Sequence, residues 1–384
     1  MFKLQAQSSR VLSAALSTVA KCMQKKNALQ ILDNILLRKD GERMLFTAST
    51  SEAQLTIAAP LTVCGGKMDK SVCVPAADVI SYISALPDCV VTLTFNDNKT
   101  LDIDYCLVKG EQTKAGQAKV TYVDADDFPL LDGCTDPVSH LVISGAYLSQ
   151  VVKQTSSFAA NDDLRPQMNG MFIDIMSDST CNFVASDGNK LIRCSHNEQG
   201  DMVQPSGVIV SSIFFPAISA FAESEKITID ANAKTIHIYD EDTDLLCRTV
   251  EGRYPNYNSV IPTSSPYYVV FDKKEMLDSI KRVRLFGSHA TQLVKLEKDG
   301  AFIELSSQDI DHATESCEQV CIETADCIDG FAIGFNADFF FTALAAITED
   351  SVRIQLSDAT RAAVVTANIA APTTLVVLMP LQLN

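Results

Sequence analysis

The sequence predicts an α+β protein built from three similar domains, each with two helices and about eight strands. The first observation is length, because 384 residues exceed what a single hydrophobic core usually holds. The second is a pattern that occurs three times: a strand, an amphipathic helix, alternating strands and turns, and then a further strand–helix–strand segment. The third is the repeat length of about 125–135 residues, which is too long for a solenoid unit and suits whole domains.

Each repeat opens with a helix that has one apolar face, because apolar side chains recur at i, i+4 and i+7. The positions are Leu12, Leu16 and Val19 in the first repeat, Leu148, Val152 and Thr155 in the second, and Met276, Ile280 and Val283 in the third. Thr155 is the weakest match to the pattern. We expect these faces to pack against the core of each domain.

The second half of each repeat is a short apolar strand, a helix and another strand. The expected helices end near Leu86, Phe221 and Ile347. Stretches rich in Pro, Ser, Thr and Gly near 132–137 and 261–266 separate the repeats. The predicted domains are therefore residues 1–133, 137–262 and 266–384.

Charge and cysteine content restrict the class of protein. The net charge of −17 argues against a protein that grips nucleic acid through many phosphate contacts. Twelve cysteines are sparse and irregularly spaced for a chain of this length, so reduced thiols in a cytosolic protein are the favoured interpretation. A zinc site at Cys317, Cys321 and Cys327 is disfavoured because no CxxC pair is present.

No segment of the sequence predicts a membrane protein or an enzyme. Residues 11–20 are interrupted by Ser and Thr, which favours an amphipathic helix over a signal peptide, and no run of about 18 apolar residues occurs. The five histidines are scattered, and the acidic runs at 124–127 and 240–244 lack a calcium-loop pattern and suit solvated loops. We predict no catalytic residues, no metal ligands and no cofactor.

Residues 164–194 contain the most informative local pattern. Met171, Ile173 and Ile175 alternate with their neighbours as in a strand, and a turn is expected at 177–179. A return strand from Phe183 leads to Asp187-Gly188, a strong turn signal.

Three motifs in this order resemble the β sliding clamp family of bacterial DNA polymerase III. They are Arg165 with Met168–Met171 and Ser186–Leu191; Glu251–Tyr257 with Val260–Pro262; and Val377–Leu381 at the carboxyl end. Each motif alone is weak, but together they span most of the chain. The resemblance implies three domains of the DNA-clamp fold that form a ring as a head-to-tail homodimer.

The resemblance also implies function. A clamp is a non-enzymatic, cytoplasmic processivity factor that encircles double-stranded DNA. Its partners are the replicative DNA polymerase, the clamp loader and repair proteins, which attach through short clamp-binding peptides. The family's peptide groove corresponds to Arg165, Met168, Ser186, Gly188, Asn189, Lys190, Leu191, Pro255, Ser259, Val260, Thr360, Ala362, Val377, Leu378, Met379, Pro380, Leu381 and Gln382.

The chain departs from the family pattern at four positions that affect this groove. Asn189 stands where His is frequent, Lys190 where Arg is usual, and Ser259 where a basic residue is frequent, while Asn384 extends the carboxyl end. We expect the apolar pocket to persist and its polar rim to differ.

Positive charge gathers on the first helix of each repeat within this acidic chain. Such segregation of charge suits a ring with a cationic hole. The alternative explanation is that amphipathic helices carry Lys and Arg on their solvent-exposed face in any protein. A ring needs few phosphate contacts because encirclement itself prevents escape. The expected DNA-facing residues are Arg10, Lys21, Lys25, Lys26, Lys153, Lys281, Arg282 and Arg284.

Two other classes of function remain open at this point. One is a scaffold of three repeated domains that does not encircle DNA. The other is a metal-dependent enzyme that uses the acidic loops. A dimer with a ring outline would favour the clamp, whereas stoichiometric binding of a divalent cation would favour the enzyme.

Overall fold

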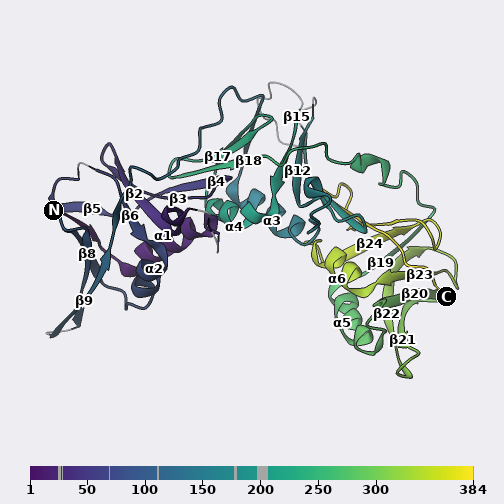
Figure 1. Cartoon of the computed structure of the whole chain (residues 1–384). Coiled ribbons are helices and arrows are strands. Elements are labelled where there is room, and N and C mark those ends of the chain that lie inside the picture. Colours follow the sequence, from purple (N-terminus) through teal and green to yellow (C-terminus); the bar gives the residue numbers. More distant parts are fainter. Residues whose placement is uncertain are drawn as a thin grey trace. The chain divides into compact units, whose positions relative to one another are not determined.

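The computed structural model describes residues 1–24, 27, 29–68, 70–109, 112–176, 180–196 and 206–383 (Figure 1). The turn expected at 177–179 lies outside these residues, as do Lys25, Lys26 and Asn384. The described chain separates into two compact units. The first contains residues 1–149 and 213–249, and the second contains residues 150–196, 206–212 and 250–383.

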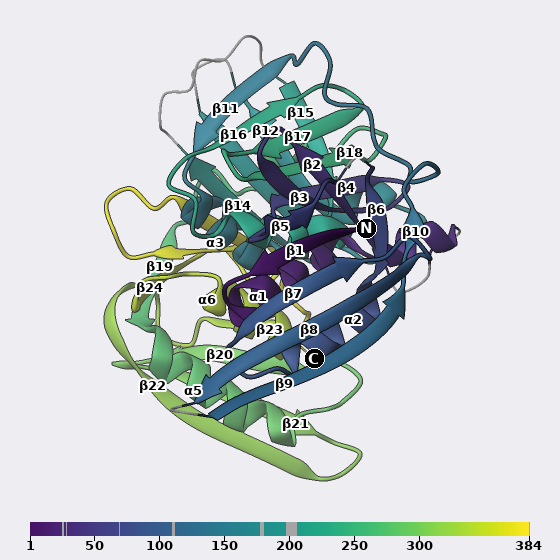
Figure 2. The same ribbon diagram turned by 90° about the vertical axis from the view of Figure 1, so that its left-hand side faces the viewer.

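The first unit holds two antiparallel sheets. The five-stranded sheet has the order β5-β1-β7-β8-β9, and Figure 2 shows β7, β8 and β9 side by side. Its strands are β1 (Phe2–Ala6), β5 (Thr62–Gly66), β7 (Val90–Phe95), β8 (Thr100–Lys109) and β9 (Gln112–Thr121).

The second sheet of this unit has nine strands in the order β10-β6-β2-β3-β4-β18-β17-β16-β11. They are β2 (Asn34–Asp40), β3 (Arg43–Ser49), β4 (Ala53–Ala58), β6 (Val72–Pro75), β10 (Val123–Asp124), β11 (Ser139–Ile143), β16 (Ile227–Ala231), β17 (Thr235–Tyr239) and β18 (Thr243–Arg248).

The second unit is built on twelve strands in the order β15-β12-β13-β14-β26-β25-β24-β19-β22-β21-β20-β23. They are β12 (Gly170–Ile175), β13 (Cys181–Ser186), β14 (Lys190–His196), β15 (Ser206–Ser211), β19 (Tyr267–Asp272), β20 (Leu293–Asp299), β21 (Phe302–Asp309), β22 (Thr314–Asp326), β23 (Ala332–Asn336), β24 (Ser351–Leu356), β25 (Ala363–Ala367) and β26 (Thr374–Leu378).

The six α-helices of the described chain occur as two per predicted domain. They are α1 (Ser9–Val19), α2 (Ala76–Ser84), α3 (Gly145–Thr155), α4 (Phe215–Ile218), α5 (Lys273–Val283) and α6 (Ala337–Ala345). Every residue of the three predicted apolar triads is buried, as the helical period requires. Helix α4 is shorter than expected, because the turns on both sides of it, including the one that reaches Phe221, are 3₁₀.

One backbone hydrogen bond recurs at the start of the first helix in each repeat. The amides of Ser9, Gly145 and Lys273 donate to a carbonyl that follows the second helix, over 2.8, 2.9 and 2.7 Å. The acceptors are the carbonyls of Cys89, Ser224 and Asp350. This shared bond shows that the three segments are folded alike, and the predicted α+β fold with three repeats is confirmed. The domain boundaries at 133 and 262 stay predictions.

Each unit contains a sheet that continues from one repeat into the next. In the first unit, β4 pairs antiparallel with β18, so that Leu55 lies opposite Leu245. In the second, β14 pairs antiparallel with β26, so that Leu191 lies opposite Val377. In both cases the second strand of a hairpin joins the last strand of the following repeat. Backbone hydrogen bonds therefore join consecutive repeats directly.

The carboxyl-terminal tail is held at two points after β26 ends. The Met379 amide donates to the Asn189 carbonyl over 2.9 Å, and the Leu381 amide donates to the Gly334 carbonyl over 2.8 Å. Gly334 lies on β23, at the edge of the sheet. A Cβ at this position would lie 2.9 Å from the Leu381 carbonyl oxygen, 2.9 Å from Leu383 Cδ2 and 2.7 Å from Leu293 Cδ1. Glycine is therefore required here by the close approach of the tail.

We predict that Gly334→Ala releases the tail and lowers the free energy of unfolding by about 1–3 kcal/mol, as expected for an inserted methyl group in a packed site. Carboxypeptidase digestion should remove the tail of the variant faster than that of the parent chain. Gly133→Ala is the control, because no atom lies within 4 Å of a Cβ at that position.

The same substitution in a chain shortened after Leu378 distinguishes two causes of lost stability. One is the clash with the carboxyl-terminal tail, and the other is a disturbance of strand β23 itself. The tail atoms are then gone, and of the three atoms nearest to the new methyl group only the flexible end of Leu293 remains. An equally large loss of stability in the shortened chain would contradict the role assigned to Gly334.

Candidate peptide-binding groove and basic helix face

The Asp187–Lys190 turn is the rigid rim of the candidate groove. The Asp187 carboxylate accepts hydrogen bonds from the amides of Asn189 and Lys190 over 2.8 and 2.9 Å. Ser186 closes the turn, since its hydroxyl donates to the Lys190 carbonyl over 2.9 Å and accepts from the Gly188 amide over 3.2 Å. Gly188 has a φ of 94°, which glycine adopts without strain. The Asp-Gly signal thus marks a turn fixed by its own side chains.

An apolar cluster beside this turn brings together segments that are distant in the sequence. Leu191 of β14 and Val377 of β26 are buried in one cluster with Tyr254 and Tyr257, and Ala362 packs against them. Residues from three of the sequence motifs therefore meet in one place within the second unit.

The two tyrosines are held in defined orientations. The Tyr254 ring stacks on Phe172 with centroids 4.8 Å apart and planes within 3°. The Tyr257 hydroxyl donates to the Asp174 carboxylate over 2.5 Å. Burial, with the nearby Asp174, raises the pKa of Tyr257 to about 12, so this phenol stays protonated as a donor at neutral pH. These two contacts hold the segment that follows β18 against strand β12, which carries Phe172 and Asp174.

Strand alternation decides which carboxyl-terminal residues can touch a ligand. Val377 belongs to the apolar cluster, its neighbour Leu378 faces the opposite side of the strand, and both side chains are buried. Met379 is 45% exposed and Val260 is 50% exposed, so these two residues offer apolar surface to a partner.

The remaining candidates differ in exposure. Met168, Ser186 and Lys190 are buried, as Leu191, Val377 and Leu378 are, and Ala362, Pro380 and Leu381 are half-buried. The exposed candidates are Arg165, Gly188, Asn189, Pro255, Ser259, Val260, Thr360, Met379 and Gln382. Whether these side chains contact a peptide stays a prediction.

Lys190 faces inward, away from the solvent expected at a groove rim. Its ammonium pairs with the Asp187 carboxylate and lies 4.6 Å from the centroid of the Phe339 ring and 5.7 Å from that of Phe158. Phe158 and Phe339 were not among the predicted site residues, because nothing in their local sequence links them to the Asp-Gly turn. Lys190 ties that turn to α6.

Arg165 is a neighbour of the Asp187–Lys190 turn. Its guanidinium pairs with the Asp162 carboxylate over 2.8 Å, which holds the pKa of Asp162 below its ordinary value. A Cβ on Gly188 would lie 3.4 Å from the Arg165 Nη1 atom, so Arg165 is next to the rim. The motif residues Arg165 and Gly188 are therefore neighbours in the fold.

The basic residues of the third repeat are largely neutralised by acids. Arg282 makes two hydrogen bonds of 2.5 Å to Glu318, and Arg284 bonds to Asp338 over 2.5 Å. Lys281 pairs with Asp278 over 2.9 Å. These contacts lower the pKa values of Glu318 and Asp278. Much of the positive charge on α5 is thus compensated locally.

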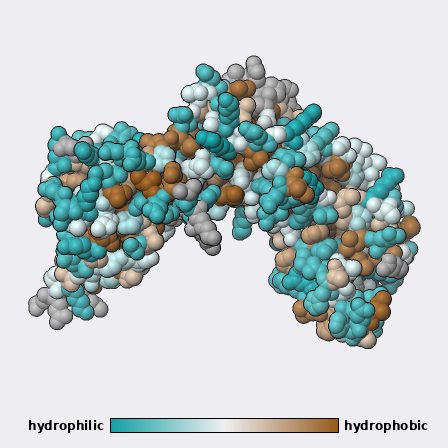
Figure 3. All heavy atoms as spheres, in the orientation of Figure 1, coloured by the Kyte–Doolittle hydropathy of each residue, from teal (hydrophilic) through white to brown (hydrophobic). Residues whose placement is uncertain are grey.

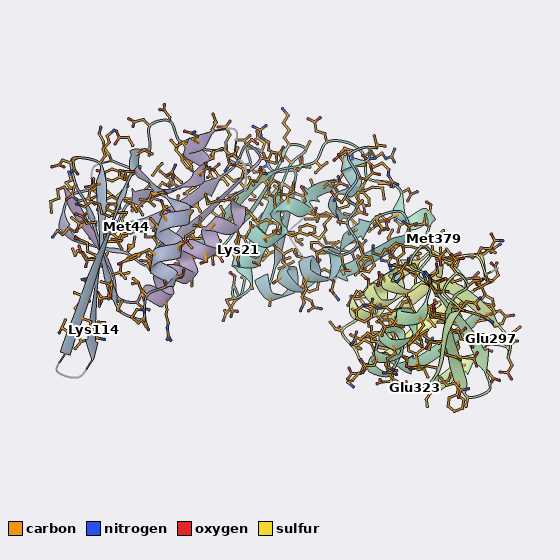
Figure 4. All side chains as sticks on the ribbon, turned by 60° about the horizontal axis from the view of Figure 1, so that its bottom comes forward. Lys21, Met44, Lys114, Glu297, Glu323 and Met379 are labelled. Atoms are coloured by element: carbon orange, nitrogen blue, oxygen red, sulfur yellow. The ribbon has the colours of Figure 1, made fainter. Side chains whose placement is uncertain are left out.

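The other predicted DNA-facing residues that the structure describes are not neutralised by acidic side chains among the described residues. Arg10 and Lys153 are exposed and form no ion pair among the described residues, and the Lys21 ammonium donates to the Ser219 hydroxyl over 2.9 Å. Figure 4 labels Lys21, and the face drawn in Figure 3 is mainly hydrophilic with scattered hydrophobic patches.

The described part of the chain holds neither a metal-binding cluster nor a membrane-spanning helix. No group of three or more His, Cys, Asp or Glu residues there is arranged to hold a metal ion. No helix in the same residues is long and apolar enough to cross a membrane.

Three sequence models of one protein family match consecutive parts of the chain. The N-terminal domain of the DNA polymerase III β subunit matches residues 3–132, the central domain matches 142–256, and the C-terminal domain matches 258–382. Together they leave only short segments unmatched.

Individual relatives and solved structures agree with these matches. A β sliding clamp from Synechocystis is 24% identical over 90% of this chain and 91% of its own length, and one from Pseudomonas aeruginosa is 24% identical over 91% and 92%. The fold matches the P. aeruginosa clamp solved with griselimycin (TM-score 0.88, 22% identity) and the Thermotoga maritima β subunit (TM-score 0.86, 21% identity), with full coverage of both chains. The chain therefore belongs to the DNA polymerase III β-subunit family, the β sliding clamps.

Proposed function

We propose that this sliding clamp acts as a closed ring of two chains around duplex DNA and tethers polymerase and repair proteins through its groove. The observation that carries the proposal is the repeated junction between consecutive repeats. β4 pairs with β18 and β14 pairs with β26, which leaves the corresponding strands β22 and β9 to pair with another copy.

The equivalence of these strands follows from their hairpins. β4, β14 and β22 are each the third strand after the first helix, and they pair with β3, β13 and β21. β9, β18 and β26 are each the third strand after the second helix, and they pair with β8, β17 and β25. A head-to-tail contact between β22 and β9 closes after two copies if the geometry returns to its start.

The two edges suit each other in charge. β9 carries Lys114 and Lys119 and no acid, and β22 carries Glu315, Glu318, Glu323 and Asp326 and no base. Figure 4 labels Lys114 and Glu323 on these strands. Among described residues, β9 has a strand partner on one side only, and residues 314–321 of β22 pair only with β21. Unpaired strand edges of opposite charge favour association.

The electrostatics of the helices suit a ring that slides. The cations on α5 are compensated, and a few others, such as Arg10 and Lys153, are free of ion pairs among the described residues. Few phosphate contacts give weak, salt-sensitive binding. Encirclement would then supply the retention that contacts do not.

The groove suits partners that carry a short peptide with spaced apolar side chains. Exposed Met379 and Val260 flank the apolar cluster, and flexible methionine side chains accept related ligands. The proposed partners are the replicative polymerase, the clamp loader and repair proteins in the cytoplasm, and the chain itself would catalyse no reaction. The comparisons do not favour the scaffold or the metal-dependent enzyme.

The first prediction concerns the ring. Light scattering at micromolar concentration should report a mass of about twice 41.7 kDa. Reversing the charge of Lys114 and Lys119 in one variant, and of Glu315 in another, should weaken each homodimer by like-charge repulsion. Mixing the two variants should restore a dimer, because both junctions of the mixed ring are then complementary.

Lys234→Glu is the matched control, since this exposed lysine lies on the turn between β16 and β17, belongs to neither edge strand and should leave the dimer intact. Failure of the mixed variants to associate, with each chain folded, would contradict the β9–β22 junction.

The second prediction concerns topology. After loading, the protein should stay on closed circular DNA and leave when the circle is cut once, because only encirclement prevents its escape. Retention is measured by gel filtration of the loaded DNA before and after cutting. Equal retention on circular and linear DNA would show that contacts rather than encirclement hold the protein.

The third prediction concerns the groove. Deleting Met379–Asn384 should abolish binding of a labelled peptide that carries Gln followed by spaced Leu and Phe residues. A few apolar anchors carry most of the affinity at a small site, with about 1.5–3 kcal/mol for each buried Leu or Phe. Fluorescence anisotropy measures the binding, and the dimer should persist. Unchanged peptide affinity in a folded, dimeric deletion variant would show that these residues do not belong to the groove.

A further inference from the structure

A row of side chains crosses the sheet of the second unit beside the apolar cluster, and two of its members are arginines. Strand register places Arg193 of β14 opposite Leu375 of β26. Leu375 lies opposite Thr366 of β25, which lies opposite Arg353 of β24. Residues opposite each other in a sheet share one face, so the four form one row. We call this row, together with Tyr268 of β19, the arginine strip.

The arginine strip is continuous with the apolar cluster of the candidate groove. Arg193 is two residues from Leu191 on β14, and Leu375 is two residues from Val377 on β26, so each pair shares a face of the sheet. Leu375 also packs against the cluster. Lys190, whose side chain points to the other face, lies against a ring of α6. The strip is therefore on the face of the sheet that α6 does not cover.

The fold neutralises neither arginine of the strip. Arg193 and Arg353 are half-buried, and neither forms an ion pair or a side-chain hydrogen bond with a described residue. The Nε atom of each is buried without a partner, which is costly for a charged group. Four other arginines of this unit pair with acids, namely Arg165, Arg282, Arg284 and Arg361. The strip thus carries two positive charges that no described side chain compensates.

An aromatic ring holds one of these arginines in place. The Arg353 guanidinium carbon lies 4.3 Å from the centroid of the Tyr268 ring. Stacking of this kind uses the flat face of the guanidinium and leaves its N–H groups free at the edge. That edge matches a carboxylate, which accepts two parallel hydrogen bonds from it. Tyrosine and arginine are also the residue types that most often carry binding energy at interfaces.

Strand spacing sets the length of a ligand that could reach both arginines. Arg193 and Arg353 are three strands apart, which is about 14 Å at about 4.8 Å for each strand. An extended peptide rises about 3.3 Å for each residue, so about four residues span this distance. Arg193 is also only about 7 Å along β14 from Leu191 of the cluster. A peptide anchored in the groove could therefore place its next few residues on the strip.

We propose that the arginine strip binds an acidic segment that flanks the apolar anchors of a partner's peptide, with Asp or Glu carboxylates on Arg193 and Arg353. The role of the strip rests on the proposed function, because the groove holds the peptide beside it. No residue of the strip is acidic in a chain of net charge −17, so acidic segments are attracted here and repelled by much of the remaining surface. The strip would then rank partners by charge, whereas the apolar groove accepts related peptides alike.

The test compares labelled peptides that share the same Gln, Leu and Phe anchors and differ only in a flank. Four Glu residues, or four Gln residues as the neutral reference, are added on either side of the anchors. Fluorescence anisotropy with the intact dimer should show that Glu on one side raises affinity about three- to tenfold at low salt, as expected of two exposed ion pairs. Salt should reduce this gain because it screens the charges.

The double variant Arg193→Gln, Arg353→Gln should lose the gain from the Glu flank and bind the Gln-flanked peptide as the parent does. Arg248→Gln is the matched control, since this exposed arginine lies on β18 in the first unit and its loss should leave the gain intact. No gain on either side in the parent, or an equal gain in the folded double variant, would overturn the role of the strip.

A charge reversal gives a positive signal that a misfolded protein could not produce. Arg353→Glu should bind a Lys-flanked peptide more tightly than the Glu-flanked one, which is the reverse of the parent's order. Arg353 is suited to this change because it lies two strands away from Leu375, at the end of the strip distant from the apolar cluster. The parent's order of preference in this variant would contradict the proposal.

Arginines also bind phosphates, so a labelled single-stranded DNA is titrated in parallel. DNA binding that the double variant loses, without any gain from Glu flanks, would assign the strip to nucleic acid and overturn the proposal. The neutral peptide separates this proposal from the groove itself. If the Gln-flanked peptide fails to bind the parent protein, the groove fails and the strip has no anchored peptide to bind. If it binds and Glu adds nothing, only the role of the strip fails.

Discussion

Backbone hydrogen bonding between consecutive repeats is the constraint on which the structure depends. The edge of a strand carries amides and carbonyls that need hydrogen-bond partners. Each repeat has two such edge strands, one at each of its two ends. The β4–β18 and β14–β26 pairs satisfy these edges within the chain. Within the described residues, β9 and part of β22 keep edges without a strand partner, and the proposed assembly pairs these edges between two copies.

The β14–β26 junction also brings together residues of the candidate groove. Pairing fixes Leu191 opposite Val377 and orients both toward Tyr254 and Tyr257, while the next residue, Leu378, turns into the core. The tail then leaves the sheet at Met379, held by the Asn189 carbonyl. Each exposed apolar residue of the tail therefore owes its position to the register of a strand pair. A shift of one residue would exchange the roles of Val377 and Leu378.

Periodicity in the sequence predicted the repeats and the helix faces, because burial imposes a spacing of 3.6 residues on helices and 2 on strands. The triad of Leu12, Leu16 and Val19 is an example, and all three side chains are buried. Motifs located the Asp187–Lys190 turn. Local pattern could not tell that Lys190 faces Phe339, nor that Leu378 is core where Met379 is surface. Those outcomes depend on partners from another repeat, and no short window of sequence contains them.

Counting charges along the sequence overstated the cations available on α5. Arg282 is paired with Glu318 of β22 and Arg284 with Asp338 of α6, so acids from elsewhere in the fold cancel charges that look free on the helix itself. The arrangement has a physical consequence for a protein that must move along DNA. Each strong phosphate contact must be broken for every step, and its energy becomes a barrier to sliding. A helix face with few uncompensated cations, such as Lys153, keeps that barrier low, and a closed topology makes the lost affinity unnecessary.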